Sequence, residues 1–294
     1  MRYRFVAAEK AQHAVSLLCR VVGVTRAGFY AWARRGRCPR RVEDEWLCRL
    51  IQAAWDASRQ TYGAPRIHAE LAQRHGVRVG RKRVARLMRR LGISGVTRRR
   101  RTGTTRPDLA APPAPDLVAR RFAADGRDRL WVADITQVAT GEGWLYLGVV
   151  MDMWSRRIVG WSMCDRLDAR LVVDAVAMAV ARRRPGTGVI HHSDRGSQYT
   201  SITLADRLEQ ARIVASMGRT GSALDNAACE SVISQIKCEL VHRHRFHTRN
   251  EARMALFHYI EGFYNPRRRH SSLGFKNPIE YEKNTNHHAA PVAA

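Results

Sequence analysis

The chain has 294 residues, of which 45% are hydrophobic, and a formal net charge of +25 at pH 7. This length suffices for one large domain or two to three small ones, each with a buried core. The first residues lack the apolar stretch of a signal peptide, no run approaches the ~18 apolar residues of a membrane span, and the six cysteines form no CxxC pair. The composition therefore predicts a cytoplasmic globular protein without a membrane span, a zinc module or a disulfide framework.

The positive charge is concentrated in the first third of the chain. Residues 1–107 contain 26 basic and 6 acidic side chains, whereas residues 108–294 contain 25 basic and 20 acidic ones. A genome-wide arginine bias would act on both parts alike, so it does not explain this asymmetry. Because nucleic acid is bound chiefly by neutralising its phosphates with Lys and Arg, the first third is predicted to contact double-stranded DNA.

A first helix-turn-helix-like segment is predicted within residues 1–40. The pattern favours a helix over 13–22, a turn at Gly23, and a second helix for which Thr25 serves as the N-cap. Two short helices about a glycine turn, the second rich in basic and aromatic residues, are typical of a DNA-binding unit. The predicted DNA contacts in this segment are Arg26, Arg34 and Arg35.

A second, basic helix-turn-helix-like domain is predicted over residues 41–107. Helices are expected over 61–76 and 81–93, on either side of a turn at 77–80. In the second helix apolar residues recur from Val84 at i, i+3, i+4 and i+7, so one stripe should pack while the basic residues face outward. The predicted DNA contacts in this domain are Arg81, Lys82, Arg83, Arg86 and Arg90.

The sequence pattern changes after a proline-rich linker, predicted over residues 108–127. Strands are then expected over 129–138, 143–155, 156–163, 188–193 and 213–217, and helices over 169–183, 204–211, 226–241 and 249–263. Three strands followed by alternating helices and strands predict an α/β domain with a mixed sheet, which we assign to residues 128–264. Residues 265–294 are interpreted as a polar C-terminal tail.

Three carboxylates stand out by their positions in this α/β region. Asp134 lies inside an apolar strand, where a charged side chain is costly unless it has a use. Asp194 ends the fourth strand. Glu230 lies at the edge of a helix face that also includes Lys237, beside a predicted buried face. A carboxylate at such a border can be held rigidly and still reach an open site.

Five segments resemble, in order, the OrfB-type transposases of the IS3 family, and the resemblance covers most of the chain. These segments are WVADITQV, GWLYLGVVMDMWSRRIVGW, HHSDRGSQYTS, DNAACES and YNPRRRHSSLGFKNP. The 35 residues between Asp194 and Glu230 also match the spacing of the transposase and retroviral integrase catalytic acids. The resemblance implies a ribonuclease-H-like core in which Asp134, Asp194 and Glu230 are the catalytic residues and bind two Mg²⁺ or Mn²⁺ ions.

The function implied by the resemblance is metal-dependent DNA cleavage and strand transfer at the ends of an insertion sequence. The implied partners are terminal inverted repeats, target DNA, further copies of the chain and a protein encoded in an upstream frame, present separately or as a frameshift fusion. A nucleoid-associated location in the cytoplasm follows. Hard divalent cations prefer oxygen ligands, and two of them ~3.5–4 Å apart stabilise the attacking and leaving oxygens of a phosphoryl displacement. No Ser, Tyr or Cys nucleophile is then needed.

Two other functions stay open at this point. A DNA-binding regulator, or a relic of a mobile element, would have lost catalysis, whereas the three acids are intact here. A ribonuclease-H-like nuclease without strand transfer would not need the basic N-terminal third.

Several further residues are assigned around the three acids. Asp152, His192 and Asn226 are predicted to hold the acids in position, although Asp152 is also the strongest rival carboxylate. Lys237 is predicted to contact a DNA phosphate, the alternative being a solvated lysine. The motif that begins at Tyr264 and includes Asn265, Arg269 and His270 matches the family, but its role does not follow from the residues.

Overall fold

The structure is a computed structural model that describes residues 1–34, 38–97, 124–194, 198–199, 201–217 and 227–286. The predicted DNA contact Arg35, the predicted positioning residue Asn226 and the predicted linker up to residue 123 lie outside the described residues. Within the described part of the chain, no helix has the length and apolar character needed to cross a membrane.

The N-terminal unit contains three short helices, α1 (Arg2–Glu9), α2 (Val15–Val21) and α3 (Arg26–Arg34). The Thr25 hydroxyl accepts a hydrogen bond from the Gly28 amide at 3.0 Å, so the predicted N-cap is confirmed. The sequence pattern does not predict α1, because Val6 is its only buried side chain and no periodic apolar face results.

A second helical domain follows, with α4 (Pro39–Ala57), α5 (Ala64–His75) and α6 (Arg81–Leu91). The helix-turn-helix pattern of α5 and α6 is confirmed, and Gly76 ends α5 in the left-handed conformation expected of a C-terminal glycine. The long helix α4 is absent from the sequence prediction. It packs against both of the others, and α6 buries its apolar stripe of Val84, Leu87 and Met88.

The remaining chain forms one mixed sheet, as predicted. Its strands are β1 (Leu130–Thr140), β2 (Gly143–Asp152), β3 (Ile158–Cys164), β4 (Ile190–Ser193) and β5 (Val214–Met217). Their order in the sheet is β3-β2-β1-β4-β5, with the first three antiparallel and with β4 and β5 parallel to β1. This arrangement places β1 at the centre of the sheet.

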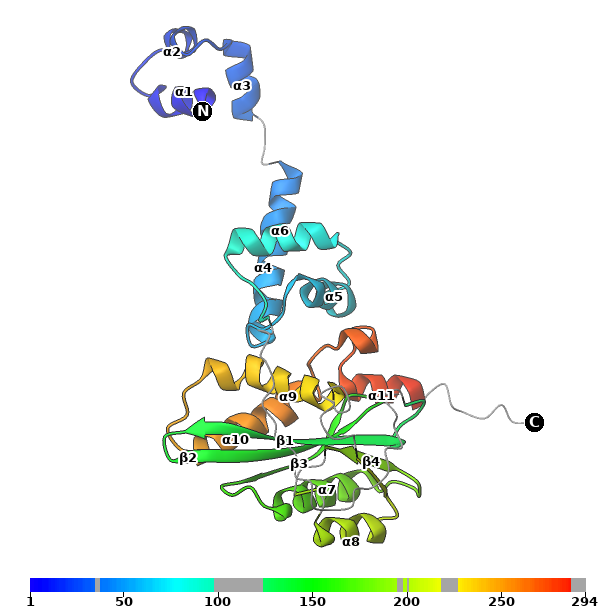
Figure 1. Cartoon of the computed structure of the whole chain (residues 1–294). Helices are drawn as coiled ribbons and strands as arrows, with labels where there is room; N and C mark the ends of the chain where they lie inside the picture. The colour runs from blue at the N-terminus through cyan, green and yellow to red at the C-terminus, as the bar shows by residue number, and fades with distance from the viewer. Residues whose placement is uncertain (35–37, 98–123, 195–197, 200, 218–226, 287–294) are drawn as a thin grey trace, which may run out of the picture.

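Helices cover both faces of the sheet (Figure 1). On one face lie α7 (Ala169–Arg183) and α8 (Ile202–Gln210); on the other lie α9 (Ala227–Glu239) and α10 (Arg249–Tyr259), on the side of α4–α6. A Cβ atom at Gly160 would lie 2.1 Å from the Ala175 carbonyl oxygen, so the close packing of α7 on β3 requires glycine there.

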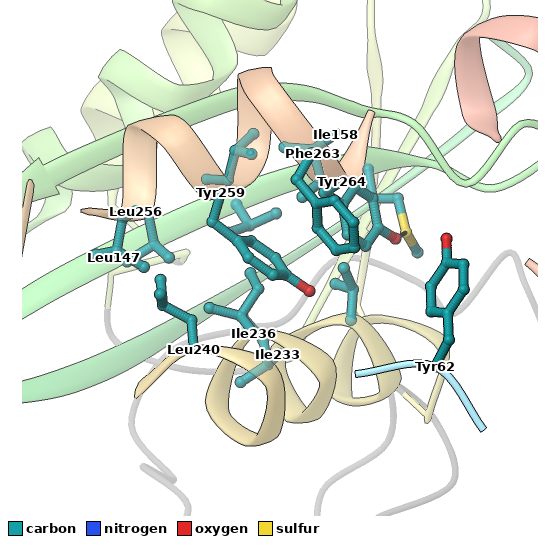
Figure 2. Close-up of a cluster of buried hydrophobic side chains, with 14 of the residues drawn as sticks. Tyr62, Leu147, Ile158, Ile233, Ile236, Leu240, Leu256, Tyr259, Phe263 and Tyr264 are labelled. Atoms are coloured by element: carbon teal, nitrogen blue, oxygen red, sulfur yellow. Dashed lines mark hydrogen bonds between the residues drawn. The ribbon is translucent and has the colours of Figure 1, made fainter. Parts of the chain in front are cut away.

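The segment after α10 is packed into the molecule and differs from the polar tail expected from the sequence. A π-helical turn (Ile260–Tyr264) continues α10, and α11 (Pro278–Asn286) ends the described chain. Figure 2 shows Tyr259, Phe263 and Tyr264 clustered with the apolar side chains of α9. Asn265 is buried and forms two hydrogen bonds of 3.0 Å with the backbone of Ile158, which joins this segment to β3.

This same segment also joins the sheet to the second helical domain. The Tyr62 hydroxyl donates to the Arg267 carbonyl at 3.2 Å and accepts from the Arg269 amide at 2.7 Å. The Arg269 side chain forms a buried ion pair with Glu70 of α5, and Arg66 donates to the Arg269 carbonyl at 3.1 Å. The motif whose role the sequence leaves open is therefore the contact between the two domains.

Candidate active site

Strand register brings the first two predicted acids together. The parallel pairing of β1 with β4 aligns Leu130 with Ile190 and Val132 with His192. Asp194 follows the last residue of β4, so continuing this register by two residues places Asp194 beside Asp134. Because side chains alternate along a strand, Asp134 points to the same face as Val132, which is the face covered by α9.

The charges of both other predicted acids act on Asp134. The pKa of Asp134 is raised from 3.8 to about 7, first by burial and then by the negative charges of Asp194 and Glu230. A hydrogen bond of 2.8 Å from the Ile135 amide to Asp134 and the positive charge of Lys237 act in the opposite direction. The site therefore has an excess of negative charge next to one lysine.

Glu230 reaches this site from the first turn of α9, at the exposed edge of the helix. The neighbouring face, with Val232, Ile233 and Ile236, is buried against the sheet, as the helical periodicity predicts. Lys237 follows Glu230 by seven residues, or about two turns of the same helix, and is partly buried.

The chemistry of the donor set fits a hard divalent cation. The three acids offer oxygen atoms alone, and carboxylates that repel one another are stabilised by a shared cation. In the part of the chain that the structure describes, no three His, Cys, Asp or Glu side chains form a ready metal-binding group. Asp194 and Glu230 thus act on Asp134 through their charge, without the geometry of a closed coordination shell.

The two histidines before Asp194 point to opposite faces of the sheet. His192 is buried, and its Nδ1 lies 2.9 Å from the Ser216 hydroxyl of β5. His191 packs near the ring of Tyr199, and burial lowers its pKa to about 4, with a smaller contribution from His192. His191 is therefore neutral at pH 7, and His192 ties β4 to β5 next to Asp194.

Asp152 is a carboxylate with a local structural role. It is fully buried and accepts hydrogen bonds of 2.8 Å from the Asp128 amide and from both the amide and the hydroxyl of Ser155. It lies opposite Trp131 in the sheet, three residues along β1 from Asp134, or roughly 10 Å away. These contacts hold the turn that follows β2.

The predicted DNA contacts fall into two groups. One group, Arg26 and Arg34 of α3 and Arg81 and Lys82 of α6, is exposed. The other group contacts α4 within the same domain, although Arg86 and Arg90 are exposed as well. Arg83 pairs with Glu43 and Asp44, Arg86 pairs with Asp44, and the Arg90 guanidinium lies 3.1 Å from the Cys48 sulfur. The expectation that all basic residues of α6 face outward therefore does not hold for Arg83, which is partly buried between two acids.

Sequence reasoning also missed a group of arginines between the domains. Arg66, Arg156 and Arg268 line a cavity beside α9, although they lie far apart in the chain. The only signal in the sequence is the basic run at 267–269, which does not show where those side chains point.

Family models match most of the chain. Two models, each described as an integrase core domain, match residues 124–223 and 211–278, and a model described as an HTH-like domain matches residues 41–101. The mixed sheet and the helical domain before it agree with these matches. The protein is thus of the polynucleotidyl transferase class, with an integrase-type catalytic core preceded by a helix-turn-helix-like domain. Cores of this type use divalent metal ions.

Two relatives align with the chain over almost its whole length. The transposase InsF for insertion sequence IS3A of Escherichia coli strain K12 is 38% identical over 96% of this chain and 98% of its own. The insertion element IS600 uncharacterized 31 kDa protein of Shigella sonnei is 40% identical over 93% of this chain and 100% of its own. The chain belongs to the IS3 family of transposases, so the resemblance stated from the sequence motifs is confirmed.

Solved structures with a similar arrangement are more distant. The catalytic core domain of BIV integrase covers 55% of this chain and 97% of its own, with 17% identity and a TM-score of 0.37. The HTLV-2 integrase catalytic core domain in complex with magnesium covers 53% of this chain and 97% of its own, with 15% identity and a TM-score of 0.39.

Proposed function

We propose that this transposase cleaves DNA at the ends of an insertion sequence and transfers the freed strand, with Asp134, Asp194 and Glu230 binding two Mg²⁺ or Mn²⁺ ions. The observation that carries the proposal is the electrostatic environment of Asp134. Burial raises the pKa of this carboxylate most, and the negative charges of two other acids, from the end of β4 and from α9, raise it further, to about 7. Carboxylates from three separate elements converge in this way where a cation is held.

The roles of the chain's own residues follow from their positions. Asp134 lies in β1 and Asp194 directly follows the neighbouring parallel strand β4, so the sheet sets their separation, while Glu230 approaches from α9. When bound, the cations stabilise the attacking and leaving oxygens of an in-line displacement at phosphorus. Lys237, on the same helix as Glu230, binds a phosphate oxygen of the DNA.

The chemistry consists of two displacements of the same kind. Water first attacks the phosphodiester at the element end, and the 3′-oxygen leaves as a 3′-hydroxyl. That hydroxyl then attacks a second phosphodiester, whose own 3′-oxygen leaves. No side chain forms a covalent bond with DNA, so the chain needs no Ser, Tyr or Cys nucleophile.

The same proposal assigns partners to the other domains. The exposed basic residues of α3 and α6 bind the terminal inverted repeats and target DNA, as the charge of residues 1–107 supports. Two element ends have to be held together, so the active form is an oligomer of this chain. We include in the proposal a nucleoid-associated location and a partner from an upstream frame, separate or fused.

The test is a strand-transfer assay with a labelled terminal-repeat duplex and Mg²⁺ or Mn²⁺. Asp134→Asn, Asp194→Asn and Glu230→Gln should each reduce cleavage and strand transfer by more than about 10³-fold, because these side chains act as one unit. DNA binding and the circular dichroism spectrum should stay as in the wild-type protein.

The matched control is Asp174→Asn, which removes one charge from an exposed residue of α7 on the opposite face of the sheet. Asp152 is not suitable as a control because it is buried with several hydrogen bonds. Substantial activity in any of the three variants would refute the assignment of that residue. A wild-type protein that binds terminal repeats without ever cleaving them would instead identify a DNA-binding regulator.

A further inference from the structure

A cavity of about 250 Å³ lies where α5, α9 and the segment after α10 meet. Its wall is basic and polar, and includes Arg66, Arg156, Arg268, Ser231, Gln235 and His270. The cavity is also lined by Ser271, Ser272, Met151, Val232 and Tyr264. The cavity is separate from the three acids but adjoins the helix that carries one of them.

Positive charge in this cavity is not balanced by the neighbouring carboxylate. Arg268 donates two hydrogen bonds to Glu239, at 2.9 and 2.5 Å, and is its closest charged partner. Arg66 lies 3.9 Å from the same Glu239 and donates to a backbone carbonyl. Among the described residues, none forms an ion pair with Arg156. Arg66 and Arg268 therefore share one carboxylate, and Arg156 adds a third positive charge, which leaves an excess of about two positive charges.

The pKa values of His270 and Arg66 at the cavity are both lowered, first by burial and then by neighbouring positive charge. Burial lowers the pKa of His270 well below its usual value, and the charges of Arg268, Arg66 and Arg156 lower it further. Burial, followed by the charge of Arg268, also lowers the pKa of Arg66. His270 is therefore neutral at pH 7, and the positive charges of all three arginines reach its position in the cavity wall.

The backbone at Arg156 adds a second, independent observation. Arg156 has a φ of 60°, in the left-handed region that favours glycine, within the turn between β2 and β3. Strained backbone of this kind concentrates at functional sites, where the position of one side chain matters. In addition, Gln235 donates from Nε2 to the Ser231 hydroxyl oxygen at 3.3 Å, so the O–H of Ser231 can itself donate into the cavity that it lines. The cavity thus offers both positive charge and a hydroxyl donor.

We infer that this cavity binds a phosphate group of the DNA strand that occupies the active site, through the guanidinium groups of Arg156 and Arg66 and the hydroxyl of Ser231. The inference rests on the proposed function, because it requires DNA at the three acids. Ser231 directly follows Glu230 on α9, so the cavity lies about 100° around the helix from the proposed catalytic acid. A strand leaving the acids along this helix brings its next phosphates to the cavity.

Such a contact would give the cavity a positioning role. One wall belongs to α5 of the helix-turn-helix-like domain, and the other walls belong to the integrase-type core. A phosphate bound here contacts both domains at once. The path of the strand at the acids is then set in part by the domain that precedes the core.

The experiment uses the full chain and terminal-repeat duplexes in which single phosphates are replaced by uncharged methylphosphonates. With the wild-type protein, one replacement close to the reacting phosphate should weaken binding by roughly 10-fold or more, the effect of losing a charge-assisted hydrogen bond. With Arg156→Gln, that same replacement should have a clearly smaller effect, because one of the partners of the phosphate is already gone while Arg66 and Ser231 remain. In this variant the slope of log K against log salt should also decrease by about one, the value for one lost phosphate contact.

Arg170→Gln is the charge-matched control, since Arg170 is exposed on α7 at the opposite face of the sheet. It should keep every methylphosphonate effect and the wild-type salt dependence. Ser231→Ala removes a hydroxyl without removing charge, and should reduce the effect at the same position even if Arg156→Gln fails to fold.

The inference is overturned if every methylphosphonate effect is equal in wild type, Arg156→Gln and Ser231→Ala. A second result would also overturn the inference. Inorganic phosphate would raise the melting temperature of the wild type but not of Arg156→Gln, while no methylphosphonate effect became smaller in Arg156→Gln. The cavity would then bind a free anion and not a DNA phosphate. If one methylphosphonate effect is smaller in Arg156→Gln, but the wild-type protein binds DNA without ever cleaving it, the cavity site is supported and the proposed activity is refuted.

Discussion

Arg268 donates hydrogen bonds from Nε and Nη2 to the two carboxylate oxygens of Glu239, at 2.9 and 2.5 Å, and both side chains are buried. The Tyr259 hydroxyl donates to the same carboxylate at 2.8 Å. Glu239 is the last residue of α9, the helix on which Glu230 lies. The pair therefore fixes the C-terminal end of that helix to the segment after α10.

We expect Arg268→Met to lower the free energy of unfolding by about 3–5 kcal/mol, because Glu239 is left buried without its charged partner. Chemical denaturation of the full chain measures this value. The double variant Glu239→Gln with Arg268→Met should recover part of the loss, since no unpaired charge remains. Arg170→Met breaks an exposed pair with Asp174 on α7 and should cost less than about 0.5 kcal/mol. Equal losses from the two single variants would contradict this account of the pair.

The same pair predicts a pH dependence of stability. Burial alone would raise the pKa of Glu239, but the hydrogen bonds and charge of Arg268 lower it below its ordinary value of 4.5. A carboxylate whose pKa is depressed by folding stabilises the protein above its unfolded pKa, and this contribution is lost as the pH falls through the folded pKa. The stability difference between wild type and Glu239→Gln should therefore be constant above about pH 5.5 and shrink below pH 4.5. A difference that grows on acidification would show that the sign is wrong.

The basic residues of α6 should separate into two functional groups. Arg81→Gln and Lys82→Gln remove exposed charges, so each should weaken DNA binding and reduce the slope of log K against log salt by about one, with an unchanged melting temperature. Arg83→Gln should lower the melting temperature, because Glu43 and Asp44 of α4 lose a partner. Gel-shift titrations at several salt concentrations and thermal unfolding measure the two effects. Were Arg81→Gln and Lys82→Gln to leave the salt slope unchanged, α6 would not be a DNA-binding surface.

Much of the fold follows from periodicity in the sequence. The bounds of α7, Ala169–Arg183, are the predicted ones, because a helix packed along one face has a repeating apolar pattern. By contrast, the sequence prediction omits α4, although its buried residues Leu47, Cys48, Ile51 and Ala54 recur at helical spacing; the exposed Val42 and Trp46 among its charged residues blur this pattern. The sequence gives no sign of α11, which starts at a proline in a polar segment.

The candidate site divides in the same way. The three acids could be located from the sequence, because each lies in a short motif that is specific to the family. The pairing of Arg83 with Asp44 could not be predicted, since the partner lies on the unexpected helix α4. Ion pairs such as that of Arg268 with Glu239 depend on which side chains meet in three dimensions, and sequence patterns do not contain that information.

Lys237 offers the sharpest test of the DNA path at the three acids. Lys237 lies on the same helix as Glu230, and its positive charge lowers the pKa of Asp134. A lysine that points away into solvent would not act on Asp134 in this way. If Lys237 holds a phosphate oxygen, Lys237→Gln should reduce strand transfer by roughly 10- to 100-fold, the value of one charge-assisted hydrogen bond.

Lys237→Arg keeps the charge at this position and should retain much of the activity, although its planar group alters the geometry of the contact. Lys283→Gln is the matched control, because Lys283 is an exposed lysine of α11. Strand-transfer rates with a labelled terminal-repeat duplex, measured at saturating DNA, separate a contact made at the reacting phosphate from a general effect on binding. Equal rates for Lys237→Gln and Lys283→Gln would mean that Lys237 is a solvated lysine, and that the phosphate is held by other residues.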